Sequence, residues 1–227
     1  MRRRRVAALA VALFVVAGCS GGGSAAPTTV APTTSSVVSD TTEPTTSTTE
    51  SATSTTVADG PVYPLTGLPA DDAVAAARPA LVVKIDNNGS ARPQSGLNEA
   101  DIVFEEIVEV QTRFAAVFQS HTADPVGPIR SGRTQDIDLL GSFNKPLFTW
   151  SGGNRNVTAA IDGSDLVSLS AQKSAVFNGG GFYRDGHRRA PHNLMAQTSK
   201  LWSLAPAGAG APPQQFHYAT AGDALQG

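Results

Sequence analysis

Residues 80–89 read ALVVKIDNNG, a short apolar run rich in β-branched side chains that stops at a polar segment. Such a run predicts a buried strand, and the polar residues that begin at Asp86 and Asn87 predict a turn directly after it. The segments that follow this strand in the sequence predict the other elements of the domain.

Two more apolar runs, residues 102–110 and 113–120, follow the first strand and are separated only by Gln111 and Thr112. This spacing predicts a β-hairpin. Short apolar runs are ambiguous, so a helical interpretation of residues 102–110 stays open, although their β-branched content favours a strand.

Helical and extended segments alternate in the rest of the domain. Residues 134–143 carry apolar side chains at helical spacing and predict an amphipathic helix. Residues 147–151 predict a strand, residues 154–161 a short helix, and residues 198–204 a last helix with Ser/Thr near its start. The mixture predicts an α/β (mixed α+β) fold without internal repeats.

The N-terminus has the features of a bacterial export signal. Arg2 to Arg5 precede an apolar run of about 11 residues, whereas a membrane-spanning helix needs roughly 20. The segment Val16-Ala17-Gly18-Cys19 resembles the lipobox of bacterial lipoproteins, in which the signal is cut before the cysteine and the thiol receives a diacylglycerol. This implies a lipid anchor on Cys19, at the outer face of the cytoplasmic membrane; an ordinary signal peptide with a chance cysteine is the alternative. Cys19 is the only cysteine, so no disulfide can form within a monomer.

The segment after the cysteine is dominated by Ser, Thr, Ala, Pro and Val and lacks aromatic residues, Leu and Ile. It cannot bury enough apolar surface to offset the entropy of ordering, so it predicts a disordered stalk with a reach of roughly 35 Å. The expected organisation is a signal peptide (1–18), a lipidated cysteine and stalk (19–60), one domain (61–204), and a linker with the start of a truncated second domain (205–227).

The charge is balanced, with 17 Lys+Arg against 19 Asp+Glu. Loss of the four signal arginines changes the net charge from −2 to about −6. This gives no indication of a nucleic-acid partner. The sequence also carries no metal-ligand spacing and no cofactor motif, so neither a metal nor a cofactor is expected.

Glu105, Glu106 and Glu109 interrupt an otherwise apolar run. On a strand, Glu105 and Glu109 share one face, about 13 Å apart, which is wider than the roughly 5 to 9.5 Å of a glycosidase carboxylate pair. They can act in acid/base chemistry, bind a hard cation, or hold arginines in a salt-bridged strand face.

Residues 127–133 read GPIRSGR, which delivers Arg130 and Arg133 in a small-residue loop before a helix. Guanidinium groups and backbone N–H groups could converge there on a carboxylate or phosphate. The alternative is that both arginines pair with Glu105 and Glu109 inside the fold.

Residues 188–193 read RRAPHN, which places His192 after a proline. His192 is a candidate general base, or a residue that hydrogen bonds to a ligand, or a structural histidine. No Ser-His-Asp order and no metal-ligand spacing accompanies it.

Five segments in order are similar to the N-terminal domain of the YerB-like lipoproteins, a family of unknown function: RPQSGL (92–97), ADIVFE (100–105), TRF (112–114), GPIRS (127–131) and RAPHNL (189–194). The resemblance spans about residues 64–204. It implies a three-layer sandwich of two β-sheets and a helical layer, and a second, smaller domain after this one. The chain departs from the family at Val110 and Gln111, where Gly-rich residues are usual. This difference concerns the conformation of the hairpin turn and not the site residues.

Polar residues on loops above a rigid sheet often bind ligands. We therefore expect one cleft to contain Asp86, Asn87, Arg92, Gln94, Glu105, Glu109, Arg113, Arg130, Arg133, His192 and Asn193. The leading hypothesis is a binding or scaffold lipoprotein of the cell envelope, not an enzyme, that holds an anionic cell-wall fragment or a partner in wall synthesis. The alternative is a cell-wall hydrolase or transferase with Glu105 or His192 as its acid/base.

Overall fold

The computed structural model describes residues 60–219, so the predicted signal peptide, Cys19 and nearly all of the predicted stalk lie outside the described residues. β1 (Leu81–Asp86) is the middle strand of a five-stranded sheet in the order β2-β3-β1-β4-β5. The other strands are β2 (Ile102–Val108), β3 (Gln111–Phe118), β4 (Leu147–Trp150) and β5 (Val167–Ser170). β1 is antiparallel to β3 and parallel to β4, so the sheet is mixed. All six residues of β1 are buried, as the apolar run predicts.

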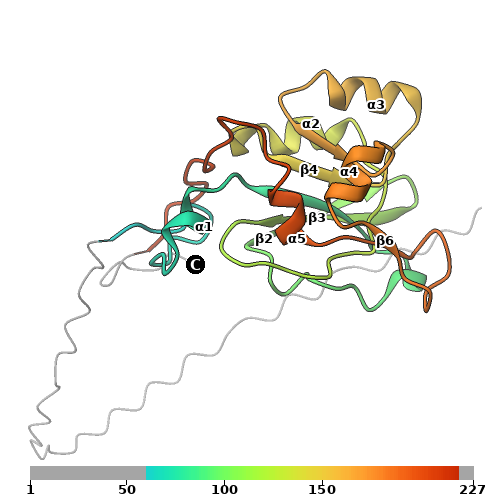
Figure 1. Ribbon diagram of the computed structural model, residues 1–227, viewed down its shortest axis with the longest axis horizontal. Coiled ribbons are helices and arrows are strands. Elements are labelled where there is room, and N and C mark those ends of the chain that lie inside the picture. The colour runs from blue at the N-terminus through green and yellow to red at the C-terminus, as the bar shows by residue number, and fades with distance from the viewer. Residues whose placement is uncertain (1–59, 220–227) are drawn as a thin grey trace, which may run out of the picture. The chain divides into compact units, whose positions relative to one another are not determined.

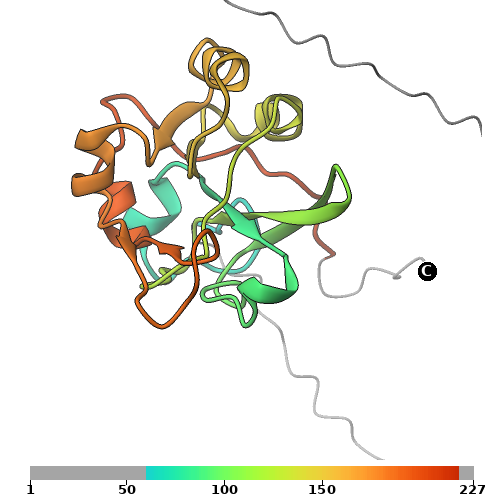
Figure 2. The same ribbon diagram turned by 90° about the vertical axis from the view of Figure 1, so that its right-hand side faces the viewer.

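β2 and β3 form the predicted hairpin, which is antiparallel and projects away from α4 (Ser174–Gly179) and α5 (Thr198–Trp202) in Figure 2. The predicted turn at Gln111 and Thr112 is wrong, because both residues belong to β3 and pair with β2. Glu109 and Val110 make the turn instead, and Glu109 adopts a positive φ of 59°. Val110 is apolar although it is fully exposed, so the apolar run extends through the turn in the sequence.

Alternate residues of β1 face opposite sides of the sheet, as expected for a strand. Leu81, Val83 and Ile85 pack in a core with residues of α4 and α5. Val82 faces the other core, which α2 (Gln135–Leu140) and α3 (Arg155–Asp162) cover. Figure 1 shows α2 and α3 together above the sheet, with α4 and α5 in front of it. The sheet therefore carries helices on both faces.

Short elements complete the described chain: α1 (Ala73–Ala77), two 3₁₀ turns, η1 (Gly89–Ala91) and η2 (Gly141–Phe143), and a second, two-stranded sheet of β6 (Tyr183–Arg184) and β7 (Leu194–Met195). The predicted mixed α+β class with two sheets and helices is confirmed. Within residues 60–219, no helix has the length and apolar character that crossing a membrane would require.

Large apolar side chains fix the sheet in place. Phe148 and Trp150 of β4 are fully buried and stack with ring centroids 5.9 Å apart. Burying each such side chain contributes roughly 1.5–3 kcal/mol. The carboxyl ends of β1 and β4 are thus held rigidly next to each other, and the polar residues described below follow those ends.

Candidate functional site

The loop that contains Arg130 fills the space between β1 and β4 where their direct pairing ends. Asp86 donates its N–H to the carbonyl of Pro128 (2.9 Å), and Arg130 donates its N–H to the carbonyl of Lys84 (2.8 Å). On the other side, Ser151 donates its N–H to the carbonyl of Arg130 (3.0 Å). The loop is therefore built into the sheet at the carboxyl ends of two parallel strands, where open α/β sheets bind their ligands.

Asp86 is the centre of this region. Its carboxylate is fully buried, and Oδ2 lies 2.7 Å from Nδ1 of His192 and 3.1 Å from Nε of Arg130. The Arg130 contact is an ion pair without hydrogen-bond geometry. The side chains of Arg130 and His192 keep 20% and 16% of their surface exposed. One buried carboxylate therefore holds two partly exposed nitrogen-bearing side chains, although His192 is 106 residues away in sequence.

Asn87, the residue after Asp86, is hydrogen bonded to several other residues that the sequence proposes for the site. Its Nδ2 donates to Glu105 (3.1 Å) and to the hydroxyl of Thr112 (2.8 Å), and its Oδ1 accepts from Arg92 (3.1 Å) and Gln94 (3.2 Å). Thr112 also donates to Glu105, at 2.6 Å. Four of the residues proposed from the sequence are therefore joined to one another directly beside Asp86.

A buried ion cluster of Lys84, Glu106 and Asp136 contacts the end of this loop, and two of its members, Lys84 and Asp136, were not predicted from the sequence. Lys84 is fully buried and donates to Glu106 and to Asp136, the latter at 2.6 Å. The other oxygen of Asp136 accepts the backbone N–H of Arg133 (2.6 Å), and Gln135 donates to Glu106 (2.8 Å). The sequence signals for this cluster are one lysine and one glutamate, Lys84 and Glu106, each within an apolar run.

The carboxyl group of Asp136 has its pKa raised to about 6. Burial is the main cause, because it disfavours the charged form, and Lys84 opposes the shift while the nearby Glu106 adds to it. Two carboxylates thus share one buried ammonium group, which only partly offsets the effect of burial on the pKa of Asp136.

Arg113 and Arg133 lie next to this ion cluster. Arg113 is buried and donates from Nη1 to the carbonyl of Ser131 (2.7 Å), and burial lowers the pKa of its guanidinium, with a further contribution from Arg133 and Arg130. Arg133 donates to Glu109 (2.8 Å) and thereby lowers the pKa of that exposed carboxyl group. The predicted pairing of an arginine with Glu109 is therefore present.

Two predicted residues are not placed as expected. Glu109 lies in the hairpin turn and not on the strand face that carries Glu105, because β2 ends at Val108. Asn193 accepts from Nη1 of Arg184 (2.8 Å) and makes no hydrogen bond with the Asp86 cluster among the described residues. Asn193 therefore orders the β6–β7 hairpin, next to His192.

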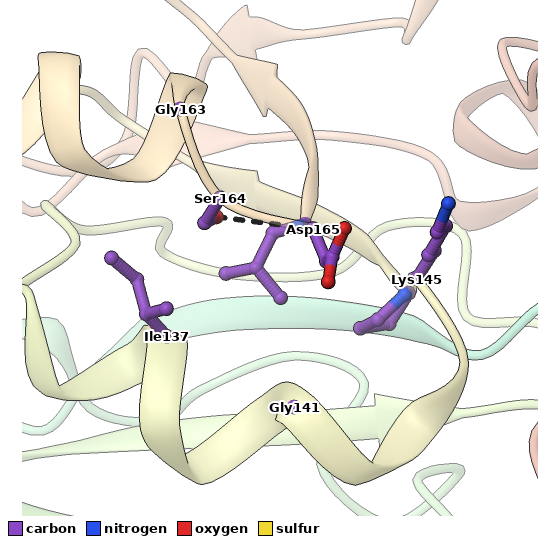
Figure 3. A pocket seen from close by; sticks show the side chains of 8 residues that line it. Ile137, Gly141, Lys145, Gly163, Ser164 and Asp165 are labelled. Carbon is purple, nitrogen blue, oxygen red and sulfur yellow. Dashed lines mark hydrogen bonds between the residues drawn. The ribbon is translucent and has the colours of Figure 1, made fainter.

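A separate hollow of about 330 Å³ lies at the amino ends of β4 and β5, whereas the Asp86 cluster lies at the carboxyl ends of β1 and β4. Figure 3 shows Lys145 and Asp165 at its rim, and its wall includes Pro146 and Leu166, which precede β4 and β5. It shares no residue with the Asp86 cluster. In the part of the chain that the structure describes, no group of three or more His, Cys, Asp or Glu side chains is arranged to hold a metal ion.

The fold and this cluster define a mixed α+β domain whose polar residues gather at the carboxyl ends of its parallel strands. The chain belongs to a family of proteins of unknown function, DUF3048, whose N-terminal domain matches residues 65–211. The predicted resemblance to YerB-like proteins is confirmed.

The chain is 37% identical over 131 residues to YerB of Bacillus subtilis (strain 168), which is described as a candidate lipoprotein; the match covers 57% of this chain and 38% of that protein. It is also similar to the crystal structure of YerB from Bacillus subtilis, with a TM-score of 0.56 and 31% identity. That match covers 63% of this chain and 48% of the crystallised chain. The chain thus spans less than half of the relatives it matches.

Proposed function

We propose that this domain is a binding module of the bacterial cell envelope that holds an anionic ligand at the carboxyl ends of β1 and β4. The observation that carries the proposal is the arrangement around Asp86. Its carboxylate is hydrogen bonded to Nδ1 of His192 and forms an ion pair with Nε of Arg130, while Nη1 and Nη2 of Arg130 and Nε2 of His192 make no hydrogen bond within residues 60–219. A guanidinium that is oriented but has its terminal nitrogens unused is suited to a carboxylate or phosphate.

The proposed location rests on the N-terminal segment and on the relative. Cys19 follows a lipobox-like sequence, and YerB is described as a candidate lipoprotein. We infer that a diacyl anchor on Cys19 attaches the chain to the outer face of the membrane and that residues 20–60 form a stalk between the anchor and the domain. The ligand is then an anionic cell-wall fragment or an envelope partner that the domain meets beyond the lipid surface.

The test compares binding with folding. Arg130→Ala and His192→Ala should abolish retention on purified peptidoglycan sacculi while each costs less than about 3 kcal/mol in the free energy of unfolding. Arg155→Ala is the matched control, because Arg155 is an exposed arginine at the start of α3. A loss of about 3 kcal/mol or more in the free energy of unfolding would instead make the cluster an internal salt-bridge network and would refute the proposed site.

A second candidate function is supported by the contact between Asp86 and His192. A histidine whose Nδ1 is held by a buried carboxylate resembles the oriented general base of hydrolases. Among residues 60–219, no hydroxyl group hydrogen bonds to His192, so the pair has no partner nucleophile in the described structure. Incubation with sacculi separates the two functions: soluble products that disappear in His192→Gln or Glu105→Gln support the hydrolase or transferase, whereas retention without products supports the binding module.

A further inference from the structure

A hollow of about 490 Å³ lies beside the Asp86 cluster. It is lined by two loops, and none of the residues that line it is Arg130 or His192, which the proposed function uses. One loop contributes Arg92 and Pro93, and the other contributes Asp185 and the segment 187–189. The second loop connects β6 to β7 and ends next to His192. The hollow is therefore formed by residues that are adjacent in sequence to the proposed site.

Hydrogen bonds of Arg188 hold the two loops of the hollow together. Arg188 donates from Nε to Asp185 (3.1 Å), from Nη1 to the carbonyl of Ala91 (2.9 Å), and from Nη2 to the carbonyl of Pro93 (2.7 Å). Asp185 also accepts the backbone N–H of His187 (2.9 Å). Arg188 thus ties the two loops together and fixes the walls of the hollow before any ligand arrives.

The charge of the hollow is positive on a chain that is negative overall. Three arginines and one aspartate line it, which gives a formal charge of +2 with His187 neutral, while the whole chain carries −2. Arg189 is exposed, and its side chain makes no hydrogen bond among residues 60–219. Arg92 is exposed and uses only Nη2, on Asn87. Two guanidinium groups are therefore available to an anion in the hollow.

The hollow and the Asp86 cluster are connected at both loops. Arg92 donates to Asn87, the residue directly after Asp86. The carbonyl of Arg189 accepts the backbone N–H of His192 (3.0 Å), so one turn carries Arg189 at its start and His192 at its end. A ligand that occupies the hollow consequently lies next to a ligand held by Arg130 and His192.

We propose that the two regions form one extended site for a linear polyanion, a polymer with an anionic group on successive units. This inference rests on the proposed function and names its ligand class. One anionic group contacts Arg130 and His192, and a following group enters the hollow at Arg92 and Arg189. A single small anion would use only the first position.

The test measures affinity with probes of different valency. The full chain is titrated with inorganic phosphate, with linear polyphosphate and with polyglutamate at fixed ionic strength, because salt screens such contacts. We expect both Arg92→Ala and Arg189→Ala to weaken polymer binding by roughly threefold to tenfold, and Arg189→Ala, which lies outside the Asp86 cluster, to leave phosphate binding unchanged. Arg155→Ala should change neither. Either polymer bound in this way supports the inference, and the tighter polymer identifies the anionic group.

Two outcomes overturn the inference and differ in what they say of the proposed function. If the double variant Arg92→Ala/Arg189→Ala binds polymers as the wild type does, while Arg130→Ala weakens binding of every probe, the site accepts a single anion and the proposed function survives. If Arg130→Ala also leaves every affinity unchanged, both the extended site and the proposed function fail. Melting temperatures of all variants are measured alongside.

Discussion

Replacement of the buried lysine is the most direct test of how the site is supported. Lys84→Met removes the one cation within residues 60–219 that contacts both Glu106 and Asp136, and leaves two carboxylates in a buried position. Removing one partner of a buried ion pair typically costs about 3–5 kcal/mol. Because a domain of this size loses roughly 2–4 °C per kcal/mol, the melting temperature should fall by about 6–20 °C.

The loss should depend on pH in a definite direction. Lys84 holds down the pKa of Asp136, so its removal raises that pKa above about 6. A carboxyl group with a raised folded-state pKa favours folding below its unfolded-state pKa of 3.8, and this contribution is lost as the pH rises through the folded-state pKa. The destabilisation of Lys84→Met should therefore be largest near neutral pH and should shrink towards acidic pH.

Urea denaturation at about pH 7.5 and about pH 5 measures this effect as the difference in free energy of unfolding. Lys173→Met is the matched control, because Lys173 forms an exposed pair with Asp162 at 3.0 Å and should contribute less than about 1 kcal/mol. A loss below about 1 kcal/mol for Lys84→Met, or an equal loss at both pH values, would refute the assignment of Lys84 as the counter-ion of this buried cluster.

Other expected outcomes concern the titrating group, the core, the anchor and the stalk. The free energy of unfolding of the wild type relative to Asp136→Asn should decrease by about 3 kcal/mol between roughly pH 4 and pH 6 and then stay constant; a difference that does not vary with pH would contradict the raised pKa. Trp150→Ala should cost about 3–5 kcal/mol in urea denaturation, and a cost under about 1 kcal/mol would show that the β4 core is not closely packed. Cys19→Ser should move the protein from the membrane fraction to the medium or leave it unprocessed, and equal retention would exclude the lipid anchor. A chain that begins at Gly60 should melt at the same temperature as the mature chain; a drop of several degrees would mean that the preceding residues pack on the domain.

β1 was predictable because a continuous apolar run is typical of a strand that is buried on both faces. The β2–β3 hairpin was predictable from two β-branched runs with a short polar break between them, although one face of β2 is exposed. The helix predicted at residues 134–143 is present as α2 and η2. β5 was missed because, with four residues, it contains only two alternations of an apolar and a serine side chain, too few to stand out as a strand pattern. The strands of the β6–β7 hairpin have two residues each, which is too short for any periodic pattern.

The site was predictable where it depends on local sequence and not where it depends on packing. The loop positions of Asp86, Arg130 and His192 suggested that they meet, and the structure brings them together. Lys84 and Asp136 were not identified, because a lysine is rarely buried and the partner that permits its burial comes from α2, 52 residues further along the chain. Whether the assembled residues bind a ligand stays a prediction.

The hairpin has a consequence for the solubility of the protein. β2 is an edge strand of the described sheet, and its outward face exposes Val103 and Ile107 on either side of Glu105. An open, apolar strand edge is a template for pairing with another chain, and a charge in its middle is a common protection against aggregation. Glu105 is in the position of such a gatekeeper residue, and Glu105→Gln should increase self-association of the protein even if the residue takes no part in any reaction.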